Sequence, residues 1–283
     1  MSLLKVILLA IVQGLAELLP VSSSAHVVVA EKLMGMDPSA PAMTLLLVML
    51  HTGTMFAVIV YFWKQWRETF FSSAEKFKRF AWQAIVATAL TGVLGLILMK
   101  IIEKTLFKGA PHAQIEDLFG QLQIVAPALL AAGILILVAG LKEGRVPDEK
   151  ESPEITSGQA GIIGAVQGLC LPFRGFSRSG ATISVGMLQG IQKARVEAFS
   201  FALAVILTPP VVGREALRLH HASQGGFGAA AFPSLLGAVF SFLAGLVALR
   251  WLSAWLERGR WYYFGIYCIL ASGVVFALHH AGY

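Results

Sequence analysis

The sequence predicts an all-α membrane protein with six transmembrane helices plus two re-entrant helical hairpins, arranged as an inverted-topology repeat. Of the 283 residues, 57% are hydrophobic and only 13% are charged, whereas a soluble domain has about 25% charged residues. Mean hydropathy is +0.73, and six apolar segments are long enough to cross a bilayer. The phrase Val12-Gln13-Gly14-Leu15 returns as Val166-Gln167-Gly168-Leu169, which indicates an internal repeat in a hydrophobic chain.

The predicted spans are uninterrupted apolar stretches, each of which reads as one membrane-crossing helix. The fourth is the weakest, because Pro209-Pro210 interrupt its end and proline removes a helical hydrogen bond. The six segments are roughly 43–63, 80–102, 122–141, 198–213, 232–256 and 262–281.

Two further segments, roughly 3–34 and 159–191, are apolar but broken in the middle, at Pro20–Ser24 and Pro172–Ser179. Each is predicted to form two half-length helices around a polar turn. A half-length helix cannot cross about 30 Å of hydrocarbon, so each pair should enter the membrane and return to the same side. Its turn is tolerated only where protein or water surrounds it.

A charged stretch at 142–157, which contains Pro147 and Pro153, is the predicted linker between two repeats, 1–141 and 158–283. Each repeat then has one hairpin and three spans. Because three is odd, the second repeat starts on the opposite face of the membrane. The two hairpins should therefore enter from opposite faces and meet near the midplane.

Loop charges predict the orientation, because cytoplasmic loops are enriched in Lys and Arg. One side carries 14 of these residues and the other 6, and the split is still 12 against 6 without Arg174 and Arg178. The richer side should be cytoplasmic, which places both termini outside. The loops on this richer side are 64–79, 142–197 and 257–261. Those on the other side are 1–42, 103–121 and 214–231.

The net charge indicates which partners the chain can bind, and the cysteine spacing bears on disulfide and metal sites. The net charge of +6 suits contact with membrane lipids that have anionic headgroups. Nucleic acid is excluded as a partner because no basic stripe with interleaved aromatics occurs. Cys170 and Cys268 each lie in an apolar run and have no disulfide or metal spacing. The sequence leaves open whether the chain forms a homo-oligomer.

The first hairpin carries acidic, hydroxyl and imidazole groups. Gln13 and Glu17 are four residues apart and share a helix face. The serine cluster at 22–24 falls at the start of the second half-helix, where unpaired N–H groups attract phosphate. His26 follows Ser23 by about one turn. Hydroxyl, imidazole and carboxylate are the parts of an activated nucleophile or of acid–base catalysis.

The second hairpin supplies positive charge. Arg178 lies between Ser177 and Ser179, and Thr182 follows one turn later. A guanidinium fork fits phosphate oxygens, and each charge-assisted hydrogen bond contributes about 1.5–3 kcal/mol. These groups predict a diphosphate site. Glu17 and Arg178 also have a purely structural interpretation, as a pair that holds the hairpins together, but ionisable residues inside a membrane are functional by default.

With these motifs the chain resembles the undecaprenyl-diphosphate phosphatase family of the bacitracin-resistance type, over essentially its whole length. The family's first motif is Glu/Gln-x-x-x-Glu followed by Pro-x-Ser-Ser-x-x-His, matched here by Gln13, Glu17, Pro20, Ser22, Ser23 and His26. The second is Pro-Gly-x-Ser-Arg-Ser-x-x-Thr, matched by Gly175, Ser177, Arg178, Ser179 and Thr182.

The resemblance implies hydrolysis of undecaprenyl (polyprenyl) diphosphate to the monophosphate and phosphate, which recycles the lipid carrier of cell-wall synthesis. It implies the bacterial inner membrane, with the active site facing the periplasmic side. It also implies a divalent cation, Mg or Ca, in contact with Glu17. Whether Ser23 or His26 attacks is left open. The implied catalytic residues are Glu17, Ser23, His26 and Arg178, and the implied substrate-binding residues are Gln13, Ser22, Ser177, Ser179 and Thr182.

The chain departs from the family pattern at a few positions. Arg174 stands where the family has Pro, Ala25 where Gly is usual and Leu18 where Phe is usual. Arg174 either adds a second cation to the pocket or turns toward the headgroups. Gln13 carries no charge, so a metal would have one carboxylate fewer. These changes affect substrate preference and metal affinity more than reaction type.

Other interpretations compete with a phosphatase. A lipid transporter or flippase also uses inverted repeats and broken helices, but transport needs no nucleophile. A phosphatidic-acid-phosphatase type expects a histidine five residues after the Ser-Arg motif, where Ser184 stands. A non-catalytic scaffold needs neither Glu17 nor Arg178. Outside the motifs, His51 is interpreted as an interface or packing histidine, and Gly14 and Gly168 as close-packing positions.

Overall fold

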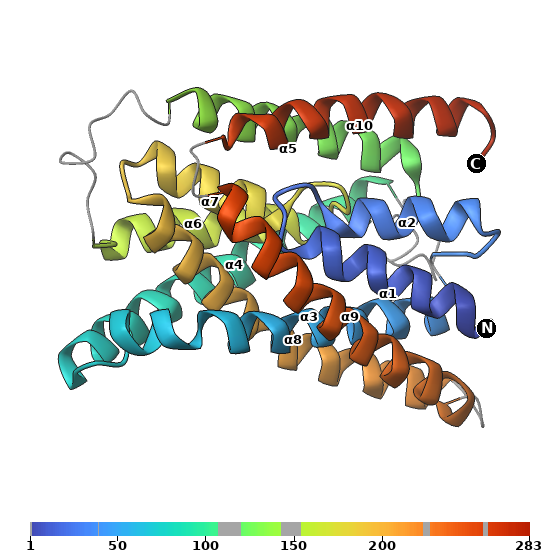
Figure 1. Ribbon diagram of the computed structural model, residues 1–283. Helices are drawn as coiled ribbons and strands as arrows, with labels where there is room; N and C mark the ends of the chain where they lie inside the picture. The colour runs from blue at the N-terminus through green and yellow to red at the C-terminus, as the bar shows by residue number, and fades with distance from the viewer. Residues whose placement is uncertain (1, 39, 107–119, 143–153, 223–226, 257–259) are drawn as a thin grey trace.

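The computed structural model describes residues 2–38, 40–106, 120–142, 154–222, 227–256 and 260–283 (Figure 1). This part of the chain folds into helices joined by turns and contains no strand. In chain order the helices are α1 (Leu3–Glu17), α2 (Ser23–Leu33), α3 (Pro41–Thr69), α4 (Ala74–Leu106), α5 (Leu122–Lys142), α6 (Ser157–Cys170), α7 (Arg178–Leu188), α8 (Lys193–Ala222), α9 (Phe227–Leu256) and α10 (Tyr262–His280).

Six of these helices, α3, α4, α5, α8, α9 and α10, are long and apolar enough to cross a membrane. They coincide with the six predicted segments, so the prediction of an all-α, multi-pass membrane protein is confirmed. The expected interruption at Pro209-Pro210 does not end α8, which continues to Ala222. Neighbouring helices and local adjustment can compensate for hydrogen bonds that proline removes in an apolar setting.

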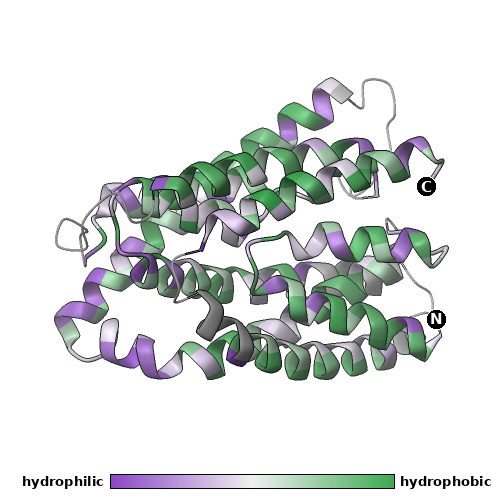
Figure 2. Cartoon of the chain, turned by 45° about the horizontal axis from the view of Figure 1, so that its top comes forward, coloured by the Kyte–Doolittle hydropathy of each residue, from purple (hydrophilic) through white to green (hydrophobic). Residues whose placement is uncertain are grey.

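The hydropathy of the residues agrees with this assignment of membrane-crossing helices. Figure 2 shows hydrophobic residues along the middle of the long helices, with hydrophilic residues toward helix ends and turns. Many large apolar side chains are exposed, among them Leu96 and Ile97 on α4 and Leu270 and Val274 on α10. In a membrane protein these faces contact lipid rather than water. Both chain ends lie at one end of the molecule, and the turn between α3 and α4 lies at the other (Figure 1).

The two broken segments form two helical hairpins, α1–α2 and α6–α7. At about 1.5 Å per residue, α1 and α6 are about 22 Å long and α2 and α7 about 16 Å, all shorter than a bilayer core. Each hairpin is closed at its base by one side chain. Lys5 donates from Nζ to the Met34 carbonyl at 2.6 Å, and Gln159 donates from Nε2 to the Gln189 carbonyl at 3.3 Å.

The duplicated glycines make matching helix contacts. Helix α1 packs on α9, and α6 packs on α4. A Cβ on Gly14 would lie 2.8 Å from the Ser241 carbonyl oxygen, and a Cβ on Gly168 would lie 2.8 Å from that of Thr91. Both glycines therefore permit close helix approach, as the sequence predicted. The first helix of each hairpin thus packs on a long helix from the other half of the chain.

The hairpin turns cover residues 18–22 and 171–177. Ser22 has a φ of 65°, a left-handed conformation that costs a non-glycine residue about 1–2 kcal/mol. Gly175 has a φ of 115°, and a Cβ there would lie 2.5 Å from the Val125 carbonyl oxygen. The first turn therefore depends on a left-handed residue at Ser22. The second turn depends on a glycine that lies close to the backbone of α5. Of the predicted linker 142–157, residues 143–153 lie outside the described residues.

Candidate active site

The tips of the two hairpins meet through one ion pair. The Arg178 guanidinium Nη2 donates to Glu17 Oε1 at 2.7 Å. The side chains are largely buried, with 24% of Arg178 and 11% of Glu17 exposed. Glu17 is the last residue of α1 and Arg178 is the first of α7, so the pair forms where both helices end at the turns. The structure therefore brings together the two halves of the predicted site.

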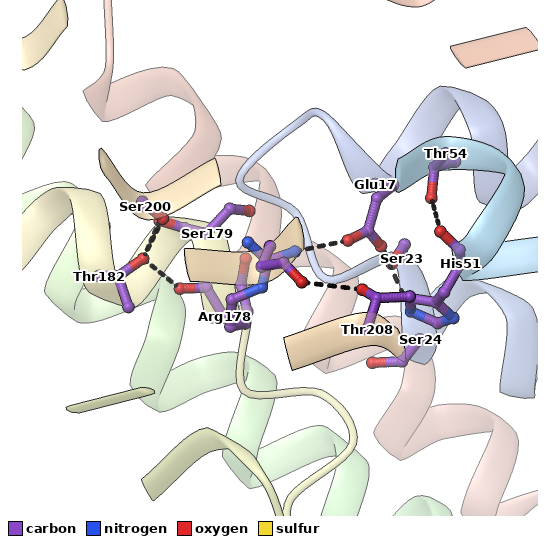
Figure 3. Close-up of polar contacts among 12 residues, drawn as sticks. Glu17, Ser23, Ser24, His51, Thr54, Arg178, Ser179, Thr182, Ser200 and Thr208 are labelled. Carbon is purple, nitrogen blue, oxygen red and sulfur yellow. Dashed lines mark hydrogen bonds and ion pairs between the residues drawn. The ribbon is translucent and has the colours of Figure 1, made fainter. Parts of the chain in front are cut away.

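Three more groups lie around the second carboxylate oxygen of Glu17, Oε2, and Figure 3 shows two of them, Ser23 and His51. Ser23 Oγ donates to Oε2 at 2.5 Å, and Gln13 Nε2 donates to the same atom at 2.9 Å. His51 Nε2 lies 3.4 Å from Oε2. The carboxylate therefore faces a hydroxyl, an amide, an imidazole and a guanidinium from four different segments of the chain.

The Arg178 guanidinium has a second nitrogen, Nη1, that takes no part in the ion pair. Its Nη1 is buried and has no hydrogen-bond partner. The neighbouring Ser177 caps α7 by accepting from the Gly180 N–H at 3.1 Å. Because a buried guanidinium N–H without a partner is costly, a ligand that brings an acceptor to Nη1 gains that missing bond. A phosphate oxygen suits this position.

A cavity of about 400 Å³ opens beside this cluster. Five of the predicted site residues besides Glu17 line it: Ser22, Ser23, Ser177, Arg178 and Ser179. Its remaining walls are mostly apolar side chains from α3, α4, the second turn and α8, namely Leu47, Val48, Met55, Val58, Met99, Leu171, Phe173, Phe176, Phe201, Ala204, Val205, Leu207 and Val211. The cavity therefore combines the polar and cationic cluster around Glu17 with walls that are mostly apolar.

Three predicted site residues are not among the described lining residues of this cavity. His26 contacts the Tyr267 hydroxyl at 2.6 Å through Nε2, and the Ser22 carbonyl at 2.8 Å through Nδ1. Its ring also stacks on Tyr267 of α10. The Ser23 hydroxyl donates to Glu17, so it and the His26 ring have different partners, and a catalytic role for His26 stays a prediction.

Gln13 and Thr182 are fully buried and act through other residues. Gln13 touches Glu17, as described above. Thr182 Oγ1 lies 2.6 Å from Ser200 Oγ and donates to the Arg178 carbonyl at 2.8 Å, so it joins the first turn of α7 to α8. Direct contact of these two side chains with substrate stays a prediction.

His51 is the main residue that the sequence interpretation missed. The expectation of an interface or packing histidine is wrong, since His51 lines the cavity and lies against Glu17. Its Nδ1 contacts the Leu47 carbonyl at 2.8 Å. The available signal was an ionisable residue in the middle of an apolar span, which is functional by default.

Further charged and polar groups line the same cavity. Arg174, one of the departures from the family pattern, is on the wall together with Arg214 of α8. Arg174 interacts electrostatically with Glu31 of α2. Gln167, from the repeated phrase, also lines the cavity, and its Oε1 is buried without a hydrogen-bond partner. The cavity thus has three arginines and a free amide acceptor.

Few of the described side chains could bind the divalent cation that the resemblance implies. Among the described residues no group of three or more His, Cys, Asp or Glu side chains is placed to hold a metal. Both Glu17 oxygens already accept from donors: Arg178 on Oε1, and Ser23 and Gln13 on Oε2. The residues present therefore do not fit a metal centre held by the protein alone.

Comparison with known proteins gives a consistent result over nearly the whole chain. The family model described as "Bacitracin resistance protein BacA" matches residues 6–274. The chain is 58% identical to Undecaprenyl-diphosphatase 2 of Acinetobacter baylyi, over 98% of each chain. It is 34% identical to Undecaprenyl-diphosphatase 1 of Burkholderia pseudomallei, over 96% of this chain and 95% of the relative. The family expected from the two motifs is thereby confirmed, and the chain belongs to the bacitracin resistance protein BacA family.

Proposed function

We propose that this chain hydrolyses undecaprenyl diphosphate to undecaprenyl phosphate and inorganic phosphate. The observation that carries the proposal is the cluster of Ser23, Glu17 and Arg178 at the polar end of a largely apolar cavity. This combination offers a nucleophile, a proton acceptor and a phosphate-binding cation, which hydrolysis needs and simple binding does not. The relatives' names are those of diphosphatases.

In the first step, Ser23 Oγ attacks the terminal phosphorus. The 2.5 Å hydrogen bond to Glu17 Oε2 directs the hydroxyl proton to the carboxylate as the Oγ–P bond forms. The bond between the terminal phosphorus and the bridging oxygen breaks, and its electron pair leaves with the lipid monophosphate. Arg178 Nη1 donates to the equatorial oxygens, whose charge is stabilised in the transition state.

In the second step, water completes the hydrolysis. Once the first proton has left Glu17 with the lipid monophosphate, the carboxylate accepts a proton from water. The water oxygen bonds to phosphorus, the Oγ–P bond breaks and Ser23 regains its proton. Inorganic phosphate is released, and the enzyme returns to its starting state.

The remaining predicted residues have supporting roles in this scheme. Ser22 and Ser179 line the polar end of the cavity and contribute hydroxyl contacts to the diphosphate. Ser177 fixes the start of α7, Gln13 orients Glu17 and Thr182 anchors α7 to α8. The apolar walls take the first isoprene units of the tail, whose burial contributes about 0.8 kcal/mol per CH₂.

A divalent cation, Mg or Ca, is proposed to enter with the diphosphate rather than to occupy a protein-held centre. Magnesium is commonly bound through one or two carboxylates together with substrate phosphates, and Glu17 is the carboxylate at this site. No step above passes through it.

The hairpins are proposed to re-enter the bacterial inner membrane from opposite faces, within two inverted repeats, 1–141 and 158–283. Support comes from the matched base contacts of the hairpins and from the equivalent packing of Gly14 and Gly168. The site is proposed to open toward the periplasmic side. The cavity reaches Thr44 at the start of α3 and Arg214 near the end of α8, and the loop charges predict that end to be outside.

The proposal is tested by phosphate release from undecaprenyl diphosphate by the purified protein in detergent. Wild type should turn over, while Glu17→Gln and Arg178→Ala should lose about 10²-fold or more. Arg67→Ala and Glu68→Gln are matched controls, because both residues are exposed at the end of α3. A wild type that releases no phosphate but moves the lipid across vesicles would favour the transporter alternative, which the comparisons do not support.

A further inference from the structure

His51 occupies a fixed position beside the reacting groups. It lies on α3, where Nδ1 is 2.8 Å from the Leu47 carbonyl oxygen. A carbonyl oxygen only accepts hydrogen bonds, so Nδ1 carries a hydrogen and the ring is held by its own helix. About a third of the side chain (32%) is exposed, and this residue lines the cavity.

The second ring nitrogen points at the atom that receives the serine proton. His51 Nε2 lies 3.4 Å from Glu17 Oε2, and Ser23 Oγ donates to that same oxygen. A lone pair on Nε2 would face the carboxylate with like polarity, whereas an N–H there is attracted to it. A ring with an N–H on Nε2 as well as on Nδ1 is therefore the form that suits this contact.

We propose that His51 is a positioning residue for the phosphatase reaction: its Nε2–H holds the Glu17 carboxylate in the orientation in which Oε2 accepts from Ser23. Arg178 fixes the other oxygen, Oε1, at 2.7 Å. Gln13 Nε2 also donates to Oε2 at 2.9 Å, and His51 adds a contact from a third helix that restrains the carboxylate against rotation away from the serine. A misplacement of reacting groups by about 1 Å can cost about 10²-fold in rate.

This role differs from the one expected for the motif histidine. His26 is bonded to Tyr267 and to the Ser22 carbonyl, so it stabilises the start of α2. His51 comes from a different segment, outside both motifs, and supplies the imidazole that faces the cavity. The charged groups that line the same cavity are Glu17 of α1, Arg178 of α7, Arg174 of the second turn and Arg214 of α8.

The inference rests on the proposed function and is tested by three substitutions. In His51→Gln the side-chain amide reaches the place of Nε2, whereas in His51→Asn it reaches only the place of Nδ1. His51→Leu removes the donor altogether. We expect kcat of His51→Gln to stay within about 3-fold of wild type, and kcat of the other two to fall about 10- to 100-fold with KM little changed.

A double-mutant cycle with Glu17→Gln separates positioning from folding. Because His51 acts through Glu17, the His51→Leu/Glu17→Gln double variant should be no slower than Glu17→Gln alone. Melting temperatures in detergent should match wild type, and His280→Leu, an exposed histidine on α10, is the control for histidine loss.

Several outcomes would overturn the inference. These are wild-type kcat in His51→Leu, a Gln variant as slow as the Leu variant, or losses that add in the double variant. In each case wild type still releases phosphate, so the proposed function stands. A wild type without phosphate release would instead remove the proposed function and this inference together.

Discussion

Glu17 and Arg178 are 161 residues apart in the sequence, yet Arg178 Nη2 donates to Glu17 Oε1 at 2.7 Å. The pair joins the tips of two hairpins, and each residue stands at the end of a short helix. A buried charge without a partner is strongly destabilising, so each residue stabilises the other while substrate is absent. Arg178 Nη1 remains available for a phosphate oxygen. The same contact therefore assembles the site and prepares it for an anion.

Replacing Arg178 with lysine should separate the effect of charge from that of shape. Lysine carries one ammonium group, which cannot both bond to Glu17 and present a planar second donor to the diphosphate. We expect kcat/KM to fall about 10²-fold in Arg178→Lys, measured as phosphate release over a range of substrate concentrations. Arg67→Lys is the matched control, and an Arg178→Lys enzyme equal to wild type would show that one positive charge suffices.

Ser23 and His26 should behave differently when each is replaced by alanine. Ser23→Ala removes the nucleophile, and we expect a loss of at least about 10³-fold with no acid-stable phosphoenzyme from terminally labelled substrate. His26→Ala loses a hydrogen bond to Tyr267, which contributes about 1 kcal/mol of stability, and should keep most of its kcat. Labelled enzyme in Ser23→Ala would exclude Ser23 as the nucleophile, and an equal loss in His26→Ala would contradict the structural role of His26.

The duplicated glycines should tolerate no side chain. In Gly14→Ala and Gly168→Ala the new methyl group would lie 2.8 Å from a carbonyl oxygen of the facing helix, which should lower the free energy of unfolding by roughly 1–3 kcal/mol. Gly92→Ala on α4 meets nothing within 4 Å and is the control. Thermal unfolding in detergent measures all three, and similar melting temperatures would contradict the close packing.

Arg174 should contribute to substrate binding more than to the chemical step. It lines the cavity, and Glu31 interacts with it electrostatically. Removal of a cation that attracts the diphosphate equally in the ground state and the transition state raises KM and leaves kcat unchanged. We expect KM of Arg174→Ala to rise about 10-fold, since a hydrogen bond to a charged group contributes about 1.5–3 kcal/mol. A fall in kcat at constant KM would instead place Arg174 near the reacting phosphorus.

Much of the architecture could be predicted because a bilayer allows few solutions. The six spans and the two broken segments follow from length and hydropathy alone, since backbone polar groups in hydrocarbon must be satisfied within a helix. Pro209-Pro210 were misleading for the end of α8, because tertiary neighbours can stabilise a helix that contains proline. The packing role of Gly14 and Gly168 was predictable, but the partner helices were not.

The candidate site was predictable only in part. Glu17, Ser23 and Arg178 could be identified because ionisable and hydroxyl groups at helix breaks are rare in an apolar chain, and the cavity contains all three. His26 satisfied the same sequence pattern, yet its ring turns to Tyr267. Spacing along a helix fixes which residues share a face, but it does not fix the rotamer or the neighbour that the side chain meets.

Composition and hydrophobic length were enough to predict a helical membrane protein with two polar helix breaks, because both act locally along the chain. Which imidazole faces the carboxylate depends instead on how the helices pack together. His51 reaches Glu17 through the packing of α3 against α1, and that contact depends on how separate helices approach one another. Such approach is set by side-chain shape along whole helices, including the glycines, and no short motif encodes it.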